Sequence, residues 1–83
     1  MLKKYEKEII EAGKKIGKIE SNTSKLSYRL IEAKSCNEVA HIFLESCAKN
    51  NVFIDNNFIS EMLSERLDYK DVAYCLVIGI SNK

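Results

Sequence analysis

Asp68-Tyr-Lys-Asp-Val-Ala-Tyr-Cys-Leu-Val-Ile-Gly-Ile80 is the stretch that decides the fold, because no residue from Val72 to Ile80 is charged. A surface helix keeps one polar face, so a helix that is apolar on every side must be covered by the rest of the protein. The run is also far shorter than the about 20 residues that span a bilayer. A buried strand at Val77-Ile78 would have no partner strand. We therefore predict a buried C-terminal core helix.

Four further helices are predicted before it, from the three- and four-residue spacing of apolar side chains. They cover about residues 2–19, 25–34, 36–49 and 58–67, and the whole chain, residues 1–83, is predicted to be a single all-α domain, a compact bundle of about five helices. The predicted inward side chains are Leu2, Tyr5, Ile9, Ala12, Ile16 and Ile19 in the first helix, Leu26, Leu30, Ile31 and Ala33 in the second, Cys36, Val39, Ala40, Phe43, Leu44, Cys47 and Ala48 in the third, and Phe58, Ile59, Met62, Leu63 and Leu67 in the fourth.

Local signals mark the helix ends and one close contact. Ser35 and Glu38 form a capping-box pattern at the start of the third helix. Asn50-Asn51 ends that helix, because asparagine tolerates the left-handed conformation. Asp55-Asn-Asn57 and Asp68 are predicted to cap the last two helices. Gly13 and Gly17, one turn apart, predict the close approach of another helix.

Composition favours a small folded protein with reduced thiols. Apolar residues make up 46% and charged residues 30% of the 83 residues, which is typical of globular chains. The three cysteines are odd in number and widely spaced, as in cytosolic proteins. The basic start leads into a charged helix and not an apolar run, so no signal peptide is expected. We expect a cytoplasmic protein without a membrane segment.

Charge is distributed unevenly along the chain. Residues 1–34 carry nine Lys and Arg against five Glu, a net of +4, and residues 35–83 carry four against seven Asp and Glu, a net of −3. Local potential attracts polyanions more than net charge does. Two interpretations remain: an ordinary solvated surface, or a face that contacts nucleic-acid phosphates. The candidate nucleic-acid-binding residues come from the first two helices and are Lys7, Lys14, Lys15, Lys18, Lys25 and Arg29.

Catalytic patterns are not found. The single histidine, His41, is predicted on the polar face of the third helix. Cys36, Cys47 and Cys75 are predicted on apolar faces and lack the paired spacing of zinc ligands. The glycines form no phosphate-binding loop. We expect no enzymatic activity, no metal and no cofactor.

Three motifs together resemble a known family. Ala12-Gly-Lys-Lys-Ile-Gly17 resembles a glycine-containing element of a first helix. Leu26-Ser-Tyr-Arg-Leu-Ile-Glu-Ala33 resembles an element of the second, and Asp71-Val-Ala-Tyr-Cys-Leu-Val-Ile-Gly-Ile80 resembles the ending. In this order they are similar to the C-terminal helical region of the large subunit of type I CRISPR surveillance (Cascade) complexes. Some of these systems make that region as a separate small subunit from an internal start codon, which here would be Met1.

The resemblance implies a non-catalytic role in antiviral defence. Small subunits of this kind stack against copies of themselves and other Cascade subunits, and they hold the target or displaced DNA strand by backbone contacts while guide pairing supplies the sequence specificity. The lysines of the first two helices would then contact phosphates, and the acidic second half would face a neighbouring subunit. The alternative is a helical protein-interaction or regulatory module with no nucleic-acid role.

Overall fold

Five α-helices joined by short segments contribute to one hydrophobic core. The computed structural model describes residues 5–54 and 57–82, and within them the helices are α1 (Glu6–Ile19), α2 (Thr23–Glu32), α3 (Cys36–Lys49), α4 (Phe58–Leu63) and α5 (Tyr69–Ser81). These residues contain no strand, so the predicted all-α bundle of about five helices is confirmed. The predicted start of the first helix at Leu2 and the cap residues Asp55 and Asn56 lie outside the described residues.

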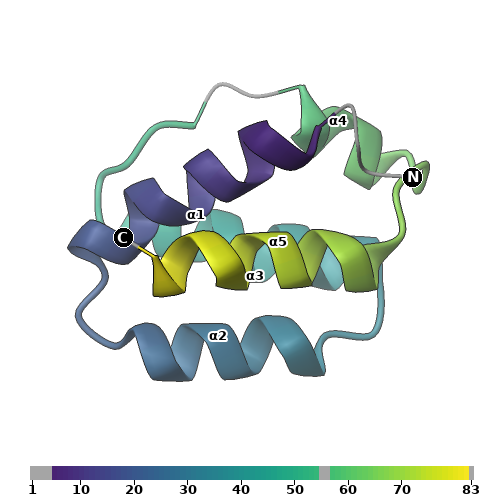
Figure 1. Cartoon of the computed structure of the whole chain (residues 1–83). Coiled ribbons are helices and arrows are strands. Elements are labelled where there is room, and N and C mark those ends of the chain that lie inside the picture. Colours follow the sequence, from purple (N-terminus) through teal and green to yellow (C-terminus); the bar gives the residue numbers. More distant parts are fainter. Residues whose placement is uncertain (1–4, 55–56, 83) are drawn as a thin grey trace.

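The C-terminal helix occupies the centre of the bundle. Figure 1 shows α5 between α1 and α2, with α3 behind this layer. Val72, Leu76 and Ile80 are almost fully buried, which confirms α5 as a core helix. Its enclosure on every side is not observed, because Tyr74 and Ile78 are 60% and 45% exposed. A chain of this length has too few residues to cover every apolar side chain.

Glycines bring α1 and α5 into backbone contact. A β-carbon on Gly79 would overlap the Ile10 carbonyl oxygen, and one on Gly13 would overlap the Leu76 carbonyl oxygen. At Gly17 it would lie 2.8 Å from the Ile80 carbonyl oxygen. The close approach predicted from Gly13 and Gly17 is therefore present, and Gly79 of α5 is a third residue that permits it and that was not predicted.

Capping interactions fix both ends of α3. The Ser35 hydroxyl accepts a 3.2 Å hydrogen bond from the Glu38 amide, as predicted, but the Glu38 carboxylate accepts from the Lys34 amide, one residue before the expected donor. At the other end Asn51 has φ 57°, and the Val52 amide donates to the Cys47 carbonyl at 2.8 Å. This is a Schellman ending with asparagine in the left-handed position.

Several predicted inward positions are wrong. On α3, Leu44 and Ala48 were predicted to face inward but are exposed, whereas Ile42 and Ser46 are buried. The neighbouring helices pack against an adjacent stripe of α3 that has the same helical spacing. Leu67 is buried, although it lies after the end of α4. The other predicted inward side chains that are exposed are Ile19, Ile31 and Leu63.

Candidate nucleic-acid interface

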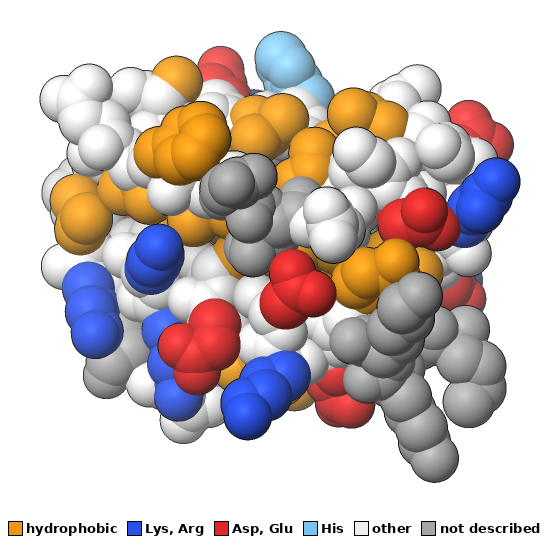
Figure 2. Space-filling model, turned by 90° about the horizontal axis from the view of Figure 1, so that it is seen from above, with side chains coloured by type: hydrophobic (Ala, Val, Ile, Leu, Met, Phe, Trp, Pro, Cys, Tyr) orange, Lys and Arg blue, Asp and Glu red, His pale blue; other side chains and the backbone are white. Residues whose placement is uncertain are grey.

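The four candidate lysines of α1 lie toward solvent, opposite its buried stripe. Lys7, Lys15 and Lys18 are exposed and make no ion pair within residues 5–54 and 57–82. Lys14 is half-buried, and its ammonium lies 3.9 Å from the Glu11 carboxylate. Figure 2 shows basic and acidic side chains interspersed on the face that carries α1, with hydrophobic side chains gathered beside them. The outer side of α1 is thus of mixed charge, and three of its lysines have no ion-pair partner among the described residues.

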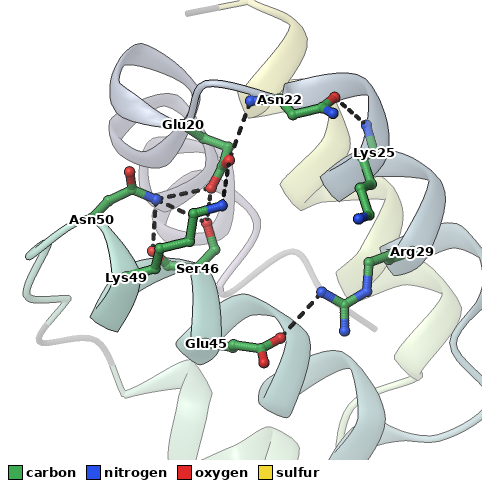
Figure 3. Close-up of polar contacts among 8 residues, drawn as sticks. All are labelled: Glu20, Asn22, Lys25, Arg29, Glu45, Ser46, Lys49 and Asn50. Carbon is green, nitrogen blue, oxygen red and sulfur yellow. Dashed lines mark hydrogen bonds and ion pairs between the residues drawn. The ribbon is translucent and has the colours of Figure 1, made fainter.

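The two candidates of α2 face α3. Lys25 and Arg29 line an open hollow of ≈ 390 Å³ between these helices, together with Glu45 and Lys49 of α3. The Arg29 guanidinium donates to the Glu45 carboxylate at 3.1 Å (Figure 3). Both side chains are about half exposed, so this pair contributes little to stability and can exchange partners. Lys25 makes no ion pair among the described residues.

The six candidate residues therefore form two groups and not one continuous face. Along most of their length α1 and α2 are separated by α5 (Figure 1). Lys25 and Arg29 line the hollow beside α3, and α5 lies between their helix and the helix that carries the four lysines. Lys49, which the sequence analysis did not select, extends the second group because α3 turns it toward the hollow.

A buried carboxylate closes one end of this hollow. Glu20 ends α1 and is 8% exposed, and its Oε1 accepts from the Ser46 hydroxyl at 2.7 Å and from the Asn50 side-chain amide at 2.8 Å. Its Oε2 lies 3.3 Å from the Lys49 ammonium and accepts from the Asn22 amide at 3.2 Å (Figure 3). The Ser46 hydrogen bond, helped by the other three, lowers the Glu20 pKa to about 2, against the effect of burial.

Among the described residues, Glu20 makes no ion pair with the neighbouring lysines of α1. Its partners are on α3 and in the segment before α2, while Glu11 does approach Lys14. Glu20 continues the helical spacing of the buried residues Ile9 and Ile16. This spacing in the sequence indicates that the Glu20 side chain points inward. A carboxylate buried in this way must be hydrogen-bonded, and the polar residues of α3 supply the donors.

The three cysteine thiols are buried in unreactive surroundings. Burial raises the pKa of the Cys47 thiol to about 11. Burial, and to a lesser extent nearby carboxylates, raises the pKa of Cys36 and of Cys75. The Cys36 thiol lies 3.1 Å from the Leu67 carbonyl oxygen, to which it donates. Buried thiols of raised pKa are poor nucleophiles.

His41 is exposed, as predicted, at a shallow hollow between α2 and α3 that also includes Tyr28 and Glu38. Within the described residues no group of three His, Cys, Asp or Glu side chains is placed to hold a metal ion. None of the helices in the described part of the chain is both long and apolar enough to cross a membrane.

The chain matches no protein-family model, no curated protein sequence and no solved structure.

Proposed function

We propose that this protein is a non-catalytic small subunit of a CRISPR RNA-guided surveillance complex of the Cascade type, which holds a DNA strand by its phosphates. The observation that supports it best is the set of cations without carboxylate partners in the described chain: Lys7, Lys15 and Lys18 on α1 and Lys25 on α2. Cations that are already paired must give up a partner before they bind phosphate, and these four need not. The resemblance of the three sequence motifs supplies the family.

Lysines of this kind would bind without reading sequence. A lysine ammonium contacts phosphate oxygens, and such contacts position a protein on nucleic acid without distinguishing bases. The hollow between α2 and α3 would supply a second contact. Lys25 has no ion-pair partner there among the described residues, and the exposed Arg29–Glu45 pair is weak enough to open toward a phosphate. The specificity would come from guide pairing in the complex.

Salt-dependent binding to single-stranded DNA tests the proposal. The slope of log K against log salt concentration is negative, and each lost phosphate contact makes it shallower by about 0.7 for single strands. The double variant Lys7→Gln, Lys18→Gln should therefore make the slope shallower by about 1.4. Arg66→Glu changes the net charge by the same amount on an exposed side chain outside both groups and should leave the slope unchanged. Equal slopes for the double variant and the wild type would reject the contact through α1.

The second candidate function is a protein-interaction module with no nucleic-acid role, and Phe53 favours it. Its side chain is 80% exposed, whereas its neighbours Val52 and Ile54 pack against the core. The Phe53 ring is thus exposed to solvent between two residues that pack against the core. Aromatic side chains often contribute most of the binding energy at protein interfaces. A Phe53→Ser variant that folds normally and loses a partner, with DNA binding absent in the wild type, would favour this function.

A further inference from the structure

A second open hollow lies between the C-terminal end of α2 and the first half of α5. Its volume is ≈ 440 Å³, and its lining includes Glu32, Ala33, Lys34, Lys70, Ala73 and Tyr74. Figure 1 shows these parts of α2 and α5 side by side. None of these residues belongs to the basic groups described above.

Tyr74 is the unusual member of this hollow. It lies in the middle of the core helix, yet its side chain is 60% exposed. Lys70 precedes it by one turn, so the two side chains lie on the same side of α5. The alanines 33 and 73 are buried, and their short side chains leave room beside the ring. An aromatic ring therefore borders an open space with a lysine next to it.

The charges around the ring favour an anionic ligand. Lys34 and Lys70 make no ion pair among the residues that the structure describes. Glu32 also lines the hollow, which leaves two cations and one carboxylate. Asp68 and Asp71 do not line it. The Asp68 carboxylate caps α5 by accepting from the Lys70 backbone amide, and Asp71 lies near Cys75, whose pKa it helps to raise.

We propose that this hollow binds single-stranded nucleic acid, with a base stacked on Tyr74 and the flanking phosphates on Lys34 and Lys70. Sites for single strands combine aromatic rings that stack on bases with lysines that follow the backbone, and the residues here are of both kinds. Within the described part of the chain neither ammonium group has an ion-pair partner, so an apolar partner helix would bury both without a counter-charge, which is costly. The inference rests on the proposed function for its class of ligand, but it uses separate residues and a contact to bases.

Comparing a normal strand with a strand that lacks bases isolates the stacking contact. Binding of the full chain to an oligothymidylate of about 12 nucleotides and to an abasic strand of the same length is followed by fluorescence anisotropy. Tyr74→Leu keeps an apolar side chain and removes the ring, and it should weaken binding to oligothymidylate about tenfold. Binding to the abasic strand should stay unchanged. Tyr74→Phe, which keeps the ring, should bind both strands like the wild type.

The double variant Lys34→Gln, Lys70→Gln tests the phosphate contacts. It should make the negative slope of log K against log salt concentration shallower by about 1.4 on both strands. The proposed stacking site is rejected if Tyr74→Leu binds oligothymidylate as the wild type does, or if its affinity for both strands is lowered equally. Loss of self-association or of a protein partner in Tyr74→Leu, with DNA binding intact, would also reject it and identify a protein interface. If the Lys7 and Lys18 variant changes DNA binding while the Tyr74 variants do not, the proposed function stands and this inference fails.

Discussion

The Ser46 hydroxyl donates a 2.7 Å hydrogen bond to the buried carboxylate of Glu20, which joins the end of α1 to the third turn of α3. The Asn50 side chain and the Lys49 ammonium, from the same end of α3, approach the same carboxylate. Because α1 and α3 belong to different layers of the bundle, this polar cluster links the two layers.

Replacing Glu20 by glutamine should destabilise the protein by about 1–3 kcal/mol. The amide keeps the shape of the side chain, but it removes the charge that Lys49 faces and sets an N–H₂ group among groups that donate. Urea unfolding followed by circular dichroism measures the loss. Glu11→Gln is the matched control, because its side chain is 64% exposed, and it should change stability by less than about 0.5 kcal/mol.

The lowered pKa of Glu20 predicts that the stability lost in Glu20→Gln depends on pH. The pKa of Glu20 is lowered in the folded protein from 4.5 to about 2, so its contribution to stability is present above pH 4.5 and is lost as the pH falls through about 2. The stability difference between wild type and Glu20→Gln should therefore be constant near neutral pH and shrink between these two values. A difference that stays constant down to the lower value would show that folding does not lower the pKa of Glu20.

Gly79→Ala should destabilise the protein by about 3 kcal/mol or more. Helix propensity alone predicts the opposite sign, a gain of about 1 kcal/mol. The added β-carbon would overlap the Ile10 carbonyl oxygen and approach the Gly13 α-carbon to 2.9 Å, so α1 and α5 would have to separate. Thermal and urea unfolding measure the change.

Ile78→Ala, at the preceding residue of α5, is the control for this substitution. Its side chain is 45% exposed, so the loss should stay below about 1 kcal/mol. A Gly79→Ala protein as stable as the wild type would contradict the close contact of the two helices.

Glu65→Gly should stabilise the protein by about 0.5–1 kcal/mol. Glu65 has φ 61° in the turn after α4, where the Arg66 amide donates to the Glu61 carbonyl at 3.0 Å in a Schellman ending. Glycine adopts this conformation without the clash of a β-carbon. Glu65→Ala keeps the β-carbon and removes the charge, so it should show no such gain. If both variants are equally stabilised, the cause is charge and not backbone strain.

The sequence by itself determined the helices. The apolar spacing, the Ser35 cap, the asparagine ending and the glycines of the first helix act over a few residues, so they can be recognised before any tertiary contact is known. The length and apolarity of the Val72–Ile80 run also placed α5 in the core, because a side chain without polar groups gains most from leaving water.

Only the tertiary structure decided how the helices are rotated and which side chains share a surface. The stripes through Leu44 and through Ile42 on α3 have the same spacing, and the choice between them depends on where the neighbouring helices pack. The six candidate cations come from two helices that are consecutive in sequence, yet α5 lies between these helices along most of their length. Besides the nearby Asn22 amide, Glu20 accepts from Ser46 and Asn50 at the C-terminal end of α3, 26 and 30 residues away. Tyr74 remained exposed because the layer of α1 and α2 leaves one side of α5 open to solvent.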